Sequence, residues 1–186
     1  MSDRIVLGSG YLYVAEFSGT IPTDETLETA ANRLGYIKGG ATLSYKPTVY
    51  KAIDDMGKVS KVITTQEDVT LKTGIMTWDG DTLKKLCSRA SVTTTAATAQ
   101  AAGKRTAKIG GGTDDGKKYV IRFHQPDAAD GDIRVTIVGK NEAGFELAFA
   151  KDAETVIDAE FTAFAHDANG TLIQIDETLP QLPSGT

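Results

Sequence analysis

The chain has 186 residues and a mass of 19.7 kDa, which suits one domain with a real core and is short for a two-domain enzyme. Hydrophobic residues make up 40% and charged residues 24%, a composition that excludes disordered and fibrous proteins. The net charge of -5 counts against proteins that bind nucleic acid by neutralising phosphates. One cysteine and two histidines exclude an internal disulfide and leave few groups for metal binding or base catalysis, so we expect no enzymatic activity, cofactor or metal.

The N-terminus, MSDRIVLGSG, lacks the basic and then apolar pattern of a signal peptide. No window approaches the roughly 18 consecutive apolar residues of a membrane-spanning helix. We therefore expect a chain that folds in a reducing cytoplasm and has no membrane partner.

The first 35 residues predict a strand followed by a short helix. Residues 11–17 alternate at period two, and one face of that strand consists of Tyr11, Tyr13, Ala15 and Phe17. After Pro22, Thr23 is a suitable N-cap and Gly35 a suitable stop. Between them, apolar residues at helical spacing are Leu27, Ala30, Ala31 and Leu34.

Residues 36–77 predict a long hairpin with its turn near residues 54–57. Its first arm, residues 41–51, mixes tyrosine and lysine with little apolar periodicity, and Pro47 cannot donate to a central ladder. The return arm recovers alternation at Val69, Leu71, Thr73 and Ile75. We therefore expect the base of the hairpin to pack on the body while residues 38–66 project.

The middle of the chain predicts a second short helix and an exposed insertion. Asp81 is a suitable cap for a helix whose apolar positions are Leu83, Leu86 and Cys87. Residues 88–116 are rich in Thr, Ala and Gly, which predicts an insertion or loop.

The C-terminal third predicts five closely spaced strands. Their alternating apolar positions fall within residues 119–123, 133–137, 145–149, 157–163 and 172–175. Turn signals at residues 130–132, 141–144 and 167–170 separate them. The fold class expected is therefore mainly β, an antiparallel β-sandwich or barrel with one or two short flanking helices and the long projecting hairpin. The last four residues, Pro-Ser-Gly-Thr, predict a frayed tail.

Two segments resemble ligand-binding motifs without meeting their requirements. Residues 111–117 match the G-x-x-x-x-G-K spacing of a phosphate loop, but Lys118 stands where a hydroxyl residue is needed and a strand follows instead of a helix. Asp127, Asp130 and Asp132 gather oxygens that suit Ca²⁺, but the EF-hand spacing is absent and a hairpin turn explains them better.

His124 and His166 are candidate bases, with Cys87 or a serine as the nucleophile, but no motif pairs them. Structural or surface histidines are the better interpretation, and Cys87 falls on the apolar stripe of a helix. The Asn169-Gly170-Thr171 sequon is interpreted as a turn.

The Tyr/Lys arm is the segment that an ordinary surface role explains least well, because ordering a solvated arm costs entropy without burying surface. Aromatic side chains on extended chain gain most by lying on another subunit or its sheet edge. We therefore predict an intersubunit arm, with an ordinary surface hairpin as the alternative. The candidate contact residues are Tyr45, Lys46, Pro47, Tyr50 and Lys51.

The order of elements resembles the major tail tube proteins of long-tailed bacteriophages. The resemblance rests on residues 34–45, on the arm and its return strand to residues 74–79, and on residues 159–163 and 170–173. It covers nearly the whole chain as a single tail-tube-like domain, residues 1–186, although residues 88–116 do not map onto the family.

The resemblance implies a virion protein, assembled in the host bacterial cytoplasm, that forms stacked hexameric rings. The rings make a hollow tube that delivers DNA without binding it specifically, and the hairpin reaches the neighbouring ring. Tape measure, tail terminator and baseplate proteins are the implied partners. Six chains of -5 give each ring an acidic character that discourages DNA from sticking. Candidate lumen-facing acids are Asp158, Glu160 and Asp176.

Two other classes remain as alternatives. A carbohydrate-binding or adhesin-like β-sandwich would stack sugars on exposed aromatics such as Tyr50 and hold Ca²⁺ at residues 127–132. A hydrolase using His124 or His166 is the more distant alternative.

Overall fold

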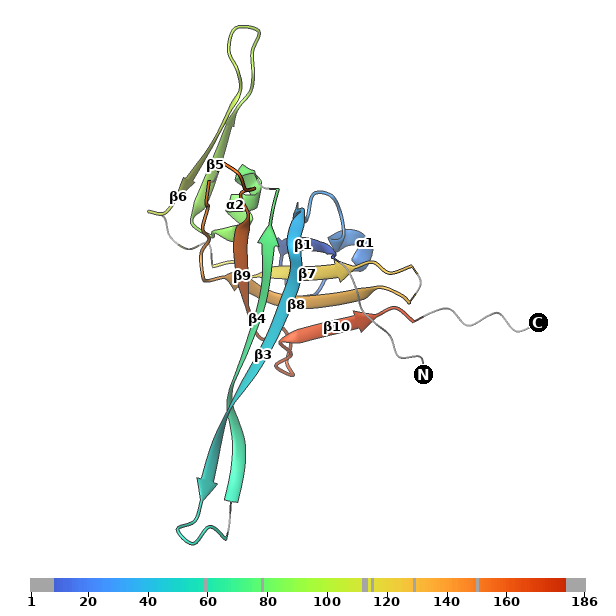
Figure 1. The fold of residues 1–186 in the computed structure, drawn as a ribbon, viewed down its shortest axis with the longest axis vertical. Coiled ribbons are helices and arrows are strands. Elements are labelled where there is room, and N and C mark those ends of the chain that lie inside the picture. Colours follow the sequence, from blue (N-terminus) through green and yellow to red (C-terminus); the bar gives the residue numbers. More distant parts are fainter. Residues whose placement is uncertain are drawn as a thin grey trace, which may run out of the picture.

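The structure is a computed structural model that describes residues 9–58, 60–77, 79–111, 114, 116–128, 130–149 and 151–179. It is mainly β and antiparallel, which confirms the predicted fold class (Figure 1). In chain order the elements are β1 (Tyr11–Glu16), α1 (Asp24–Leu27), β2 (Arg33–Gly35), β3 (Ile37–Ile53), β4 (Ser60–Ile75), α2 (Gly80–Leu86), β5 (Ala90–Thr95), β6 (Lys104–Ile109), β7 (Tyr119–Gln125), β8 (Ile133–Asn141), β9 (Ile157–Ala163) and β10 (Ile173–Glu177).

The main sheet folds over into two layers that share β8. One layer has the order β2-β1-β7-β8, and the other continues through β9-β4-β3. β8 pairs with β10 through residues 133–137 and with β9 through residues 139–141. The strands of the two layers run across each other (Figure 1), as in orthogonally packed sandwiches. Gly139 lies at the change of partner, and a Cβ there would overlap the carbonyl oxygen of Thr162.

The main core fills the space between the two layers. Leu12, Val14, Ile121 and Ile137 come from the first layer, and the second layer and α2 supply Val69, Leu71, Ile75, Ile157, Ala159, Phe161, Leu83 and Leu86. Each of these strands contributes alternate residues, as the period of a strand requires. Burial of this apolar surface is the main driving force for folding of the body.

β1 is buried on both faces. The face that contains Tyr13, Ala15 and Phe17 packs in a second cluster with Leu27 of α1, while Leu12 and Val14 enter the main core. The sequence pattern identified the strand but assigned apolar contacts to only one of its faces.

The predicted helix after Pro22 is mostly wrong, because α1 ends at Leu27 and Arg33–Gly35 forms β2. The Asn32 side chain donates hydrogen bonds to the carbonyl groups of Thr26 and Leu27, which satisfies the end of the helix. Leu34 then enters the main core from a strand paired with β1, not from a helix.

The second helix forms, but its cap is Asp79 and not Asp81. The Asp79 carboxylate accepts hydrogen bonds from the backbone N–H groups of Asp81 and Thr82, and the Thr82 hydroxyl completes a capping box. The Thr82 N–H in particular lowers the pKa of Asp79. Cys87 is the half-buried C-cap and follows the apolar stripe of Leu83 and Leu86.

Much of the segment 88–116 is a β-hairpin, where the sequence predicted an insertion or loop. β5 and β6 pair from Ala90 with Ile109 to Thr95 with Lys104. The β-branched residues of β5 favour this extended structure, and Ala107 packs against the main core. Figure 1 shows this hairpin and the β3–β4 hairpin projecting from opposite ends of the body.

The strand predicted at residues 145–149 is absent, although Phe145 and Leu147 still pack against the main core. β9 occupies the edge of β8 at residues 139–141, so the intervening segment has no ladder to join there. The other four predicted C-terminal strands correspond to β7, β8, β9 and β10.

Trp78, the tail from residue 180 and part of the phosphate-loop-like segment (residues 112, 113 and 115) lie outside the described residues. Within the described ranges, neither helix has the length and apolar character needed to span a membrane.

Candidate functional site

The β3–β4 hairpin leaves the body and continues as a free two-stranded ribbon. β4 pairs with β9 only from Thr70 to Ile75, so residues 60–68 pair with β3 alone. We call residues 45–53 with residues 60–68 the ribbon. At about 3.3 Å per residue, its nine-residue arms extend for about 30 Å. β3 is the last strand in the sheet order, so its outer edge is open to pairing with another chain.

The ribbon carries large apolar side chains that its own body does not cover. Those more than two-fifths exposed are Tyr45, Val49, Tyr50, Ile53, Met56 (in the turn), Val62 and Ile63. Tyr50 lies opposite Ile63 on one face, and Val49 and Ile53 flank Val62 on the other. Both faces of the ribbon therefore expose apolar side chains, which is typical of an interaction surface.

The predicted arm residues Tyr45 and Tyr50 lie on the ribbon. The Tyr45 hydroxyl donates to Glu67 of β4 at 2.5 Å, and this hydrogen bond raises the pKa of Tyr45. Tyr50 is 59% exposed and lies opposite Ile63 without a polar partner among the described residues. Tyr45 is thus tied to its own chain, whereas Tyr50 is available to another.

The other three predicted arm residues also lie on β3. Lys46 is opposite Asp68, Pro47 opposite Glu67 and Lys51 opposite Val62, and all three are exposed. Pro47 is tolerated because β3 is an edge strand. A bulge between Thr48 and Val49 follows, and Figure 1 shows the ribbon twisting as it leaves the body.

The sequence prediction missed the aliphatic residues of the ribbon. Val49, Ile53, Val62 and Ile63 are as exposed as the tyrosines. The signal was present as β-branched residues on both arms, but only pairing register shows which of them share a face.

Two of the predicted lumen-facing acids, Asp158 and Glu160, lie on the outer face of β9. They alternate with the buried Ile157, Ala159 and Phe161. Glu160 forms an ion pair with Lys72 of β4 at 2.8 Å, and Asp158 is exposed.

These acids line a groove of about 610 Å³ at the base of the β3–β4 hairpin. Gly39, Gly40 and Gly74, which have no side chains, and Glu146 also line it. Gly39 and Gly40 both have positive φ, which allows the bulge of β3 at this point.

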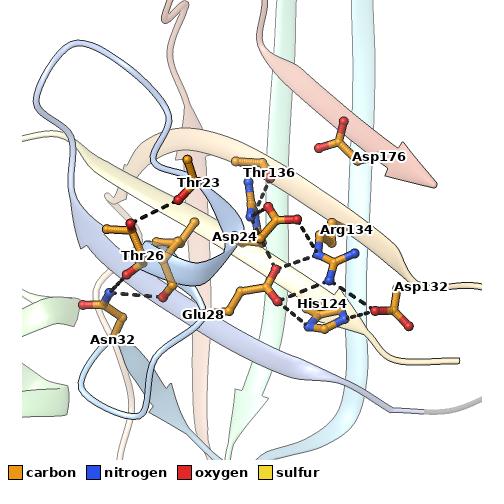
Figure 2. A network of polar contacts seen from close by, with 12 residues as sticks. Thr23, Asp24, Thr26, Glu28, Asn32, His124, Asp132, Arg134, Thr136 and Asp176 are labelled. Atoms are coloured by element: carbon orange, nitrogen blue, oxygen red, sulfur yellow. Dashed lines mark hydrogen bonds and ion pairs between the residues drawn. The ribbon is translucent and has the colours of Figure 1, made fainter. Parts of the chain in front are cut away.

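The third predicted acid, Asp176, lies on the other layer. It is on β10 opposite Arg134, and the Gln174 side chain donates to it. Figure 2 shows Asp176 beside the polar network described next. Within one chain, Asp176 therefore does not share a surface with Asp158 and Glu160.

The most extensive polar site of the described residues fastens α1 to the first layer (Figure 2). Arg122 is 2% exposed and donates to Thr136, to Asp24 at 2.5 Å and to Glu28 at 3.4 Å. Arg134 donates to Glu28 at 2.7 Å. Burial alone would lower the pKa of Arg134, but its hydrogen bond to Glu28 and the surrounding carboxylates raise it.

His124 belongs to this network. Its Nδ1 lies 2.9 Å from Glu28 and its Nε2 lies 3.0 Å from Asp132, so both ring nitrogens face carboxylates. The backbone N–H of Asp127, more than the His124 ring, lowers the pKa of Asp132. A ring engaged on both sides is suited to holding α1 and the β7–β8 turn in place, and it presents no nitrogen to a substrate.

The remaining motifs are turns and loops. At residues 127–132, the carboxylates of Asp127 and Asp132 accept backbone N–H groups from Asp130 and Asp127. Among the described residues, no group of three or more His, Cys, Asp or Glu side chains is placed to hold a metal ion. The phosphate-loop-like segment leads into β7 and not into a helix.

His166 and the sequon belong to a turn after β9. The Asp167 carboxylate accepts the backbone N–H groups of Asn169 and Thr171. Thr171 is also the main cause of the lowered pKa of Asp167. The ring nitrogens of His124 contact Glu28 and Asp132, and the backbone N–H of Cys87 donates to Leu83 at the end of α2.

Neither protein-family models nor curated proteins provide a match for this chain.

Proposed function

We propose that this chain is a structural protein that assembles with copies of itself into stacked rings of a hollow phage tail tube, the hexameric tube through which DNA is delivered. The observation that carries the proposal is the ribbon. A two-stranded hairpin is marginally stable in water by itself, and this one exposes apolar side chains on both faces. A neighbouring subunit would bury those side chains and compensate for the cost of ordering the arm.

The open edge of β3 supports the same proposal. A strand of a second copy that paired with this edge would satisfy its outward backbone groups and extend the sheet from one subunit to the next. Two hairpins that project from opposite ends of the body (Figure 1) suit head-to-tail contacts, which close into rings or continue as filaments.

The charge of the chain supports a conduit. The net charge of -5 multiplies in an assembly and disfavours adhesion of DNA. Because one face of the chain would line a lumen, its candidate acids are either Asp158 and Glu160 on one outer face or Asp176 on the other. The carbohydrate-binding alternative gains no support from the turn at residues 127–132, whose Asp127 and Asp132 carboxylates already accept backbone hydrogen bonds.

The test is to concentrate the purified protein, measure its mass by light scattering and image it in negative stain. We expect rings or tubes to form without any ligand. Deleting the tip of the ribbon, residues 50–63, is expected to leave a folded monomer that does not polymerise. A wild-type protein that stays monomeric at every concentration would contradict the proposal. If the deletion variant forms tubes at the wild-type yield, the ribbon is not required for assembly.

A further inference from the structure

The β5–β6 hairpin is strongly basic although the chain is acidic. Residues 88–111 contain four basic residues, Arg89, Lys104, Arg105 and Lys108, and no acidic residue. The chain as a whole has a net charge of -5. Its charges are therefore segregated, and one projecting end of the molecule is positive.

The pairing register divides this hairpin into two faces. Val92 lies opposite Ala107 and Thr94 opposite Arg105, and this face packs toward α2, where Val92 and Arg105 lie against Gly80. Arg105 forms ion pairs with Asp79 at 2.8 Å and Asp81 at 3.8 Å. The inward basic residue is thus neutralised within the chain.

The outward face has no such compensation. We call it the basic face, and its residues are Ser91, Thr93, Thr95, Lys104, Thr106 and Lys108. Lys104 and Lys108 are exposed and form no ion pair with any described residue. The basic face therefore presents two lysine ammonium groups together with serine and threonine hydroxyl groups.

The groove at the base of the β3–β4 hairpin has the opposite character. Its charged lining residues are three acids, Glu146, Asp158 and Glu160, and two lysines, Lys38 and Lys72. Both lysines are matched internally, because Lys38 pairs with Glu154 and Lys72 pairs with Glu160. Glu146 and Asp158 also line the groove, are exposed and have no ion pair within the described residues.

We propose that the basic face docks in the acidic groove of a second copy of this chain. The proposal rests on the self-assembly proposed above and assigns a partner to a hairpin that the tail-tube resemblance leaves unmapped. Lys104 and Lys108 would pair with Glu146 and Asp158, and the hydroxyl groups would donate to the remaining carboxylate oxygens. This contact would make Asp158 an interface residue and leave Asp176, on the other outer face, as the candidate acid for a lumen. Because the two surfaces differ, the contact is heterologous, and every copy offers one of each to its neighbours.

Charge reversal with rescue tests this contact. In Lys104→Glu/Lys108→Glu, we expect the concentration needed for assembly to rise at least about tenfold, because two attractions become repulsions. The matched control for the single variant Lys108→Glu is Lys84→Glu, because Lys84 is an exposed lysine of α2 that belongs neither to the basic face nor to the lining of the groove. Adding Glu146→Lys/Asp158→Lys to the double variant should restore assembly to near the wild-type concentration.

Each outcome decides the matter. Assembly of the double variant at the wild-type concentration would overturn this docking contact and leave the proposed function standing. A wild-type protein that stays monomeric would overturn both. If the wild-type monomer binds duplex DNA and the double variant does not, the basic face is a site for DNA phosphates and not for a second copy of the chain. Circular dichroism melting checks that each variant is folded. If the double glutamate variant does not fold, Lys104→Gln/Lys108→Gln replaces it, and a smaller loss of assembly is expected.

Discussion

The two halves of β4 experience opposite environments. From Val69 to Ile75 the strand alternates into the main core, and from Thr70 to Ile75 it pairs with both β3 and β9. Residues 60–68 pair with β3 alone and are exposed throughout. The change comes where β9 ends, because only a third strand and a facing layer provide a place to bury side chains.

The buried residues of β4 stabilise the chain, whereas its exposed residues are available to partners. Val69, Leu71 and Ile75 are buried and stabilise the body. Val62 and Ile63 have similar chemistry but are about half exposed, so they contribute little to the stability of a single chain. Substitutions in the body should therefore change the free energy of unfolding, and substitutions in the ribbon should change assembly.

The largest expected effect on stability is in the body, at Phe161. Its side chain is 1% exposed in the main core, so Phe161→Ala should lower the free energy of unfolding by about 3–5 kcal/mol. Denaturant unfolding monitored by circular dichroism measures this. Phe149→Ala is the matched control, since Phe149 is 76% exposed, and a loss as large as that of Phe161→Ala would contradict the assigned core.

A smaller loss is expected at the network below α1. Glu28→Gln removes the carboxylate that Arg122, Arg134 and His124 share, and should cost about 2 kcal/mol because Asp24 and Asp132 remain as partners. The same unfolding experiment measures it. Glu25→Gln on the exposed side of α1 should be nearly neutral, and equal effects of the two substitutions would argue against the network as a clamp.

Acidification should weaken the body through Asp132. Its pKa is lowered in the folded chain, so the carboxylate form favours folding. This contribution is complete above the unfolded pKa of about 4 and is lost as the pH falls through the folded pKa. Asp132→Asn should cost about 1 kcal/mol at neutral pH and flatten the acid limb of the stability curve. Asp130→Asn, at an exposed turn position, is the control and should change that limb less. A larger effect of Asp130→Asn than of Asp132→Asn would refute the role given to Asp132.

The smallest stability effect is expected in the ribbon. Ile53→Thr should change the free energy of unfolding by less than about 0.5 kcal/mol, yet it should raise the concentration required for assembly. Ile175→Thr is the matched control, because Ile53 is 54% and Ile175 55% exposed. Light scattering across a concentration series distinguishes them, and identical assembly curves would remove Ile53 from the contact.

Local patterns predicted the elements that depend on local chemistry. Alternation located β7, β8, β9 and β10. The turn signals at residues 130–132 and 167–170 located the turns between β7 and β8 and between β9 and β10. The same reasoning failed at Leu34, whose helical spacing was overridden by pairing of β2 with β1 and burial in the main core. It also failed at residues 145–149, where β9 had taken the edge of β8.

The sites depend on contacts between distant residues, which one sequence does not display. Arg122 and Glu28 are 94 residues apart, and nothing around either residue indicates that they meet. The ribbon was more predictable, because Tyr45, Tyr50 and Pro47 marked an arm unsuited to a core. The assignment of its apolar residues to two faces required the pairing register of β3 with β4, including the bulge after Thr48.

Amide hydrogen exchange in the monomer and in the assembled particle is the most direct measurement of the central claim, that the ribbon is an assembly surface. Assembly should slow exchange across residues 45–53 and 60–68, whereas β7 and β8 in the body should exchange equally slowly in both states. Unchanged exchange across the ribbon in a particle of verified mass would contradict the claim.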